Sequence, residues 1–246
     1  MLPHDLDRCR AALLSTDLHE RRAIARAIAE HAATQHADFL RLCYQLLDDP
    51  NLRVRDDILF HLKRFGDRDD TLAETKVLAA LAVPQLRPRA LLALGTVGTA
   101  SIFPLLYDCA VAGEMFALNA LARQSRSEMQ RQQAKALGRT WLLSEVYNQR
   151  EEALQALRIL STAGAEEDLL LEAYLKYGDE LVVWALGGAS ARMLPILHRL
   201  LKRWPVGCAE YGDVMKAIRR LETRIAYGES ADPADAQGMP YLGDFL

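Results

Sequence analysis

Three pairs of arginines in the first hundred residues have the chemistry to bind anions. They are separated by about 34 residues, a period typical of helical repeat proteins, and comprise Arg21 with Arg22, Arg53 with Arg55, and Arg87 with Arg89. Because guanidinium groups bind phosphate, such a row could follow a nucleic acid backbone. Aspartates close by in the sequence offer a second set of partners within the chain. We favour pairing within the protein, and we predict that four residues join neighbouring repeats: Asp48, Asp49, Arg55 and Arg89.

Large aromatic residues are a second group with binding chemistry, because their rings can anchor a protein partner or stack on a base. Six of them lie in predicted helices: Phe60, Phe116, Trp141, Trp184, Trp204 and Tyr211. Each sits within an apolar helical pattern, which favours packing in the core or between repeats. A binding role stays open for those on the second helix of a hairpin.

Residues for catalysis or metal binding are sparse. His19-Glu20 is the one His-Glu dipeptide, and no GxSxG, P-loop or GxGxxG motif occurs. The segment Gly95-Thr96-Val97-Gly98 is better explained as the end of a helix. The four cysteines have no CxxC spacing, so we expect them to be reduced and mostly buried. The sequence therefore predicts no catalytic residue, no metal ligand and no cofactor.

Composition indicates a helical protein without bulk attraction to polyanions. Half of the 246 residues are hydrophobic, 26% are charged, and the formal net charge is −3. Ala, Leu and Arg are abundant and favour helix, while β-branched residues are comparatively few. Asp5 and Asp7 precede any apolar run, which argues against a signal peptide, and no uninterrupted apolar stretch could span a bilayer. We expect an all-α protein in the cytoplasm.

The stretch from Phe39 to Asp67 contains one complete predicted helical hairpin. Its first helix covers residues 36–47, and a turn follows at Asp48-Asp49-Pro50-Asn51, where proline fixes φ and the polar side chains can cap the next helix. The second helix, opened by Val54-Arg55, has apolar residues on a single face at Val54, Ile58, Leu62 and Phe65.

The same alternation of apolar stripes and turns continues along the chain. It predicts further helices over residues 4–14, 17–33, 70–83, 86–98, 99–112, 114–124, 127–143, 151–163, 166–177, 179–186, 191–204 and 210–227. This amounts to about seven hairpins, each of which would bury its apolar face against its neighbours. We therefore predict one helical repeat domain at residues 1–227. Residues 228–246 are predicted to form a flexible or docked tail, and their apolar residues follow a polar linker.

The turn and helix-end motifs resemble HEAT-like repeats of the type found in phycobilisome lyase proteins. The resemblance rests on the segment Asp49 to Arg55 with Phe65-Gly66-Asp67, on Leu94 to Gly98, and more weakly on Ala185 to Gly188. It implies a right-handed α–α superhelix (an α-solenoid) whose second helices line a concave surface. Members of this class are mostly protein-binding scaffolds, and a minority are enzymes.

The resulting functional hypothesis is a non-enzymatic scaffold that binds a partner protein or peptide on its concave surface. The predicted contact residues are Phe60, Lys63, Arg64, Phe116, Asn119, Arg123 and Trp184. The alternative is an enzyme or nucleic-acid-acting protein on the same scaffold, similar to a bilin lyase or an alkylpurine DNA glycosylase. Nucleic acid is the weaker partner because the net charge is negative. The tail suggests a monomer or a weak homodimer.

Overall fold

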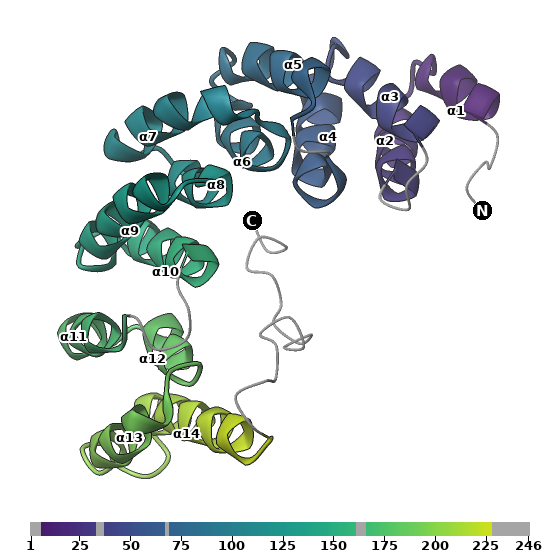
Figure 1. Cartoon of the computed structure of the whole chain (residues 1–246). Helices are drawn as coiled ribbons and strands as arrows, with labels where there is room; N and C mark the ends of the chain where they lie inside the picture. Colours follow the sequence, from purple (N-terminus) through teal and green to yellow (C-terminus); the bar gives the residue numbers. More distant parts are fainter. Residues whose placement is uncertain (1–5, 33–36, 67–68, 161–165, 228–246) are drawn as a thin grey trace. The chain divides into compact units, whose positions relative to one another are not determined.

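The computed structural model describes residues 6–32, 37–66, 69–160 and 166–227. Within these ranges the chain forms fourteen α-helices and two short 3₁₀ helices and has no strand, which confirms the all-α prediction (Figure 1). Contacts divide the chain into two compact units, Met1–Leu160 and Ser161–Leu246. We describe each unit separately. The predicted tail at residues 228–246 lies outside the described ranges.

The first unit contains ten of the described α-helices, arranged as five consecutive pairs. Each odd-numbered helix contacts the even-numbered helix that follows it. In chain order the helices are α1 (Leu6–Leu13), α2 (Leu18–Ala32), α3 (Ala37–Leu46), α4 (Leu52–Phe65), α5 (Thr71–Leu81), α6 (Arg87–Val97), η1 (Ala100–Ile102), α7 (Phe103–Val111), α8 (Ala117–Gln124), α9 (Glu128–Leu142) and α10 (Tyr147–Leu160).

The even-numbered helices of the first unit also pack on one another in series. Helix α4 contacts α2 and α6, and α8 contacts α6 and α10. The odd-numbered helices lie on the other side of this series, so the unit has two layers (Figure 1). The core fills the space between the layers. Helices α6 and α8 are almost wholly buried because each has neighbours on three sides.

Helix α4 shows how the sequence determines these elements. The Asn51 side chain accepts a hydrogen bond from the Arg53 backbone N–H and caps the first turn. Val54, Ile58 and Leu62 are fully buried, as their spacing of four residues on one face predicts. A side chain at Gly66 would meet Val97 of α6, so the end of α4 can approach its neighbour closely.

The tightest contact between even-numbered helices joins α6 to α8. A Cβ atom placed on Gly95 would lie 2.7 Å from the Ala120 Cα atom, so glycine is needed for the two backbones to approach this closely. The buried Gln124 amide donates to the Leu94 and Gly95 carbonyl oxygens at 3.2 and 3.3 Å. The Gly95 carbonyl, in the last turn of α6 where a helix leaves carbonyls unpaired, therefore gains a donor from the next even-numbered helix. The Leu94 carbonyl, which already accepts from the Gly98 N–H, gains a second donor.

The second unit comprises α11 (Glu167–Tyr177), α12 (Glu180–Leu186), η2 (Ala191–Met193), α13 (Leu194–Leu201) and α14 (Ala209–Tyr227). Helices α11 and α12 form one pair, α13 and α14 form another, and α12 packs on α14. A Cβ atom on Gly187 would lie 3.0 Å from the Ala217 Cα atom. Arg224 donates to the carbonyl oxygens of Gly188 and Ala189.

Three predicted helix boundaries differ from the structure for local reasons. Helix α10 begins at Tyr147 rather than residue 151, after Ser144 caps the turn by accepting from the Val146 N–H. Helix α8 begins at Ala117 because Phe116 has a positive φ of 68°. Helix α13 ends at Leu201, before Trp204. Pro104 lies in the first turn of α7, where its missing N–H is tolerated.

Candidate functional site

Four of the residues described above form a continuous cation–aromatic row across three even-numbered helices. The Lys63 Nζ atom lies 3.9 Å from the Phe60 ring centroid on α4. The Arg89 guanidinium carbon on α6 lies 4.9 Å from the same centroid and 6.0 Å from that of Phe116, just before α8. All four side chains are half-buried. The row therefore combines solvent-accessible rings with positive charge.

Asn119 and Arg123 continue this surface along α8. The Arg123 Nε atom donates to the Asn119 Oδ1 atom at 3.0 Å, and the Asn119 Nδ2 atom donates to the Gln155 Oε1 atom of α10 at 3.1 Å. Asn119 is only 5% exposed, whereas Arg123 is half-buried. Arg123 is thus the member of the pair that can reach a ligand. Asn119 holds it in place and links α8 to α10.

The position of Phe116 depends on a buried carboxylate from α10. Glu152 accepts from the backbone N–H groups of Phe116 and Asn119 at 2.7 and 3.1 Å, and so caps the start of α8. Burial raises the pKa of Glu152 to about 7, although these hydrogen bonds act in the opposite direction. The left-handed backbone of Phe116, unfavourable for a residue with a Cβ atom, is therefore stabilised by hydrogen bonds to Glu152 of α10.

Carboxylates lie beside several of the cations on the even-numbered helices. Arg22 donates to Asp57 at 2.7 Å and Arg26 donates to the same carboxylate at 3.1 Å. Burial raises the pKa of Asp57, but the hydrogen bonds from both arginines outweigh it and hold the pKa below its usual value. Arg89 lies 3.8 Å from Asp56. The surface is therefore mixed in charge rather than continuously positive.

The residues predicted to join repeats make contacts between helices. Asp49, in the turn between α3 and α4, pairs with Arg21 of α2 at 3.4 Å, and Asp48 pairs with Lys76 of α5. Arg89 of α6 lies near Asp56 of α4, as described above. Arg55 has a buried Nε atom without a hydrogen-bond partner among the described residues. The role of Arg55 between repeats therefore stays a prediction.

Two predicted contact residues stand apart from this group. Trp184 belongs to α12 of the second unit, where the Arg220 guanidinium carbon of α14 lies 3.7 Å from its ring centroid. The side chain of Arg64 is not among those that the structure describes. The structure therefore brings together Phe60, Lys63, Phe116, Asn119 and Arg123, and it adds Arg89 to them.

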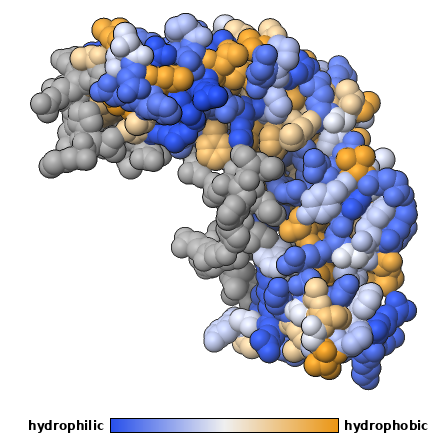
Figure 2. All heavy atoms as spheres, turned by 180° about the vertical axis from the view of Figure 1, so that it is seen from behind, coloured by the Kyte–Doolittle hydropathy of each residue, from blue (hydrophilic) through white to orange (hydrophobic). Residues whose placement is uncertain are grey.

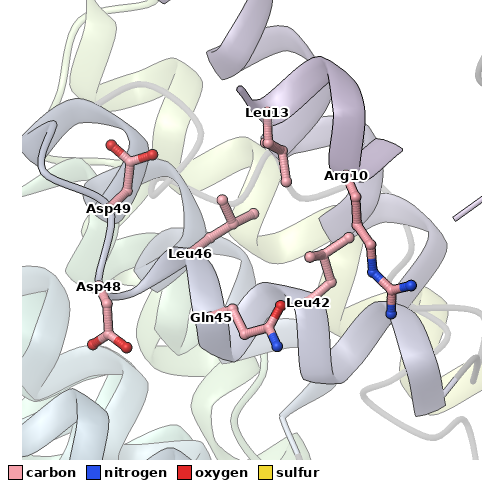
Figure 3. A pocket seen from close by; sticks show the side chains of 7 residues that line it. All are labelled: Arg10, Leu13, Leu42, Gln45, Leu46, Asp48 and Asp49. Atoms are coloured by element: carbon pink, nitrogen blue, oxygen red, sulfur yellow. The ribbon is translucent and has the colours of Figure 1, made fainter. Parts of the chain in front are cut away.

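One pocket in the first unit lies away from this surface. It has a volume of about 240 Å³, and Figure 3 shows Leu13 of α1 and Leu42 and Leu46 of α3 pointing toward one another across it. Its remaining lining residues are Arg10, Gln45, Asp48 and Asp49. Pockets for small molecules usually enclose roughly 300–1,000 Å³, so this one is small for a cofactor. On the face shown in Figure 2, hydrophobic residues are separated by hydrophilic ones.

Metal ligands and cysteine thiols are the remaining groups with reactive chemistry in the described ranges. Within them, no cluster of three His, Cys, Asp or Glu side chains could hold a metal ion. Cys9, Cys43 and Cys109 are buried and form no disulfide, as predicted, and burial raises the pKa of Cys43 to about 12. Cys208 is partly buried. None of the helices described here is both long and apolar enough to cross a membrane.

Comparisons with known proteins leave the family open. No protein-family model matches the chain, and no curated protein matches its sequence. Among solved structures, the chain is similar to a crystal structure described as an engineered protein, with 15% identity and a TM-score of 0.44. That match covers 89% of this chain and 97% of the other.

Sequence reasoning missed the residues that position the surface. Buried Glu152 and Gln124 and exposed Gln155 lie on helices with ordinary amphipathic patterns, and nothing in their spacing distinguishes a buried polar side chain from an exposed one. Their partners lie 29 to 36 residues away in the sequence, on a neighbouring even-numbered helix or directly before it. The sequence signal that could have identified these buried contacts is a polar residue that recurs about every 29 to 36 residues on the second helices of the hairpins.

Proposed function

We propose that this protein is a non-enzymatic scaffold that binds a partner protein or peptide through the even-numbered helices of its first unit. The observation that carries the proposal is the cation–aromatic row of Phe60, Lys63, Arg89 and Phe116, with Arg123 beside it. Aromatic and arginine side chains are the residue types most often responsible for binding energy at protein interfaces. The row crosses three helices, so a ligand can contact all of them together.

We further propose that the helices form an α-solenoid of HEAT-like repeats, a right-handed superhelix. Support comes from the repeated pairing of odd with even helices and from the serial packing of α2, α4, α6, α8 and α10. In such an architecture each repeat contacts only its neighbours, which leaves one side of the second helices open for binding. A cytoplasmic location is part of the same proposal.

A protein partner is favoured over a nucleic acid by the distribution of charge. Arg22, Arg26 and Arg89 lie beside Asp57 and Asp56, which would repel a polyphosphate. A protein surface can complement both signs of charge at once. We propose no second function, because no observation on the described residues favours one.

The test is partner capture by purified protein with matched charge-reversal variants. The variant Lys63→Glu with Arg123→Glu should lose a specifically captured protein, because it reverses two cations of the surface. The variant Lys202→Glu with Arg203→Glu has the same change in net charge at exposed positions after α13, and it should retain that partner. Circular dichroism and thermal unfolding must show that both variants are folded. Equal capture by the two variants contradicts the proposal.

A further inference from the structure

Residues 228–246 have a composition complementary to the cation–aromatic row. This segment contains four carboxylates and no Lys, Arg or His, and the carboxylates are Glu229, Asp232, Asp235 and Asp244. Its last eight residues include the apolar and aromatic side chains of Met239, Tyr241, Leu242, Phe245 and Leu246. The segment is therefore an acidic stretch followed by an apolar one.

The row on the first unit, together with Arg123, places three cations beside partly exposed aromatic rings, within a surface of mixed charge. Lys63, Arg89 and Arg123 are all half-buried cations, and Phe60 and Phe116 lie between them. The carboxylate of Asp56 lies beside the row, 3.8 Å from Arg89, and burial raises its pKa. A ligand with both carboxylates and aromatic rings can therefore pair with the cations and pack against the phenylalanines.

The length of the C-terminal segment matches the distance that the cation–aromatic row covers. Neighbouring packed helices lie roughly 9 Å apart, so the distance from α4 to α8 is about 18 Å. An extended stretch of eight residues spans about 26 Å at roughly 3.3 Å per residue. Residues 239–246 are thus long enough to cross the row, and the preceding residues supply acidic groups at one end.

We propose that the cation–aromatic row binds the acidic C-terminal segment, residues 228–246, of a second copy of this chain. The inference rests on the proposed function, because it names the occupant of the same surface. Each copy offers one segment and one surface, so the contact is heterologous and need not be reciprocal. A single short segment buries little area, which makes the association weak and dependent on protein concentration.

The test is sedimentation equilibrium of the full chain over a range of concentrations, with two variants and their mixture. Self-association of the wild-type chain should be lost in the surface variant Lys63→Glu with Arg123→Glu. It should also be lost in the segment variant Asp232→Lys with Asp235→Lys. An equimolar mixture of the two variants should associate again, because one supplies an intact surface and the other an intact segment. The variant Lys202→Glu with Arg203→Glu should associate like the wild-type chain.

Salt gives a second readout on the unmodified chain. Raising the salt concentration from about 50 mM to about 500 mM should weaken self-association at least about tenfold, because exposed charges are then screened. A wild-type chain that stays monomeric at every concentration overturns the inference, as does a mixture of variants that fails to associate. If partner capture still responds to the surface variant in that case, the proposed function stands while this occupant is wrong.

Discussion

The joint between α6 and α8 in the first unit and the joint between α12 and α14 in the second are built alike but exposed differently. In both, a glycine near the C-terminal end of the earlier helix lies against an alanine of the later one: Gly95 of α6 against Ala120, and Gly187, the residue after α12, against Ala217. In both, a side chain of the later helix donates to carbonyl oxygens at the end of the earlier one. The same backbone problem, unpaired C-terminal carbonyls at a close approach, therefore has the same solution twice.

The two side chains that donate to these carbonyls, Gln124 and Arg224, differ in charge and burial. Gln124 is 1% exposed and neutral, whereas Arg224 is half-buried and charged. At the opposite ends of these joints, buried Glu152 caps α8, while exposed Glu180 of α12 lies 3.8 Å from Lys216 of α14. The first unit thus relies on buried polar contacts, and its row spans three helices. In the second unit, the Trp184 ring has the guanidinium of Arg220 on the adjacent helix over it.

The largest expected effects concern the buried carboxylate. At pH 4.5, Glu152→Gln places an amide NH2 group, which cannot accept a hydrogen bond, beside one of two backbone N–H groups, so unfolding should become easier by about 2 kcal/mol. Urea unfolding followed by circular dichroism measures this change. The matched variant Glu180→Gln alters an exposed pair and should change stability by less than about 0.5 kcal/mol.

The same carboxylate gives a pH dependence with a defined sign. The ordinary pKa of Glu152 is 4.5 and its pKa in the folded protein is about 7, so the folded state binds a proton between these values while the unfolded state does not. Stability from this group is complete below pH 4.5 and is lost as the pH rises toward 7, by about 3 kcal/mol in total. The stability advantage of wild type over Glu152→Gln should therefore shrink across this range. An advantage that grows with pH contradicts the assignment.

Alanine substitutions at Gly95 and Gly187 should destabilise the protein in proportion to how closely the two helices approach at each joint. Gly95→Ala forces a Cβ atom to 2.7 Å from a backbone atom and should cost about 2 kcal/mol, whereas Gly187→Ala, at 3.0 Å, should cost about 1 kcal/mol. Thermal or urea unfolding of each variant gives the comparison. Gly212→Ala in α14 meets nothing within 4 Å and should stabilise by about 0.5 kcal/mol. Equal costs at Gly95 and Gly212 would remove the argument for a close approach.

Substituting the side chains that donate to the helix-end carbonyls should destabilise the buried joint between α6 and α8 more than the accessible joint between α12 and α14. Gln124→Met leaves the buried Gly95 carbonyl oxygen without this donor, while the Leu94 oxygen keeps its hydrogen bond from the Gly98 N–H, and should destabilise by about 1.5 kcal/mol. Arg224→Met exposes its carbonyls to water, so we expect about 0.5 kcal/mol. If equilibrium unfolding shows that Arg224→Met lowers the free energy of unfolding more than Gln124→Met does, the contrast between a buried and an accessible joint is wrong.

The smallest effect concerns the cation over Trp184. Arg220→Met should lower stability by about 0.5 kcal/mol and change the tryptophan fluorescence, because a cation at 3.7 Å from the ring centroid is removed. The corresponding variant Lys63→Met in the row should leave stability within about 0.5 kcal/mol but weaken partner capture. Capture that responds to Arg220→Met and not to Lys63→Met would transfer the candidate surface to the second unit.

Local sequence signals predicted the helices well. The Asp-Pro turn before α4, Ser127 before α9 and Pro104 in α7 each mark a helix start through their own backbone chemistry. Apolar spacing then identified the buried face, as Val54 and Ile58 illustrate. These signals depend on neighbours within one turn of helix, so they can be read from a single segment.

The arrangement of the candidate site depended on contacts that no segment specifies by itself. Phe116 has a left-handed backbone conformation, and its N–H donates to Glu152 of α10, a residue 36 positions later in the sequence. Asn119 was predicted to contact a partner, but it is buried and bonded to Gln155 of α10. Arg89 was predicted to join repeats, and it also lies between the two rings of the row. The sequence thus identified most members of the surface but not how they are held.

The most direct test of the central claim is hydrogen exchange mass spectrometry of the full chain with and without its captured partner. Partner binding should slow amide exchange in peptides covering α4, α6 and α8, which carry the cation–aromatic row. Exchange in α11 to α14 should stay unchanged. Protection confined to α11 to α14, with α4, α6 and α8 unaffected, would contradict the account.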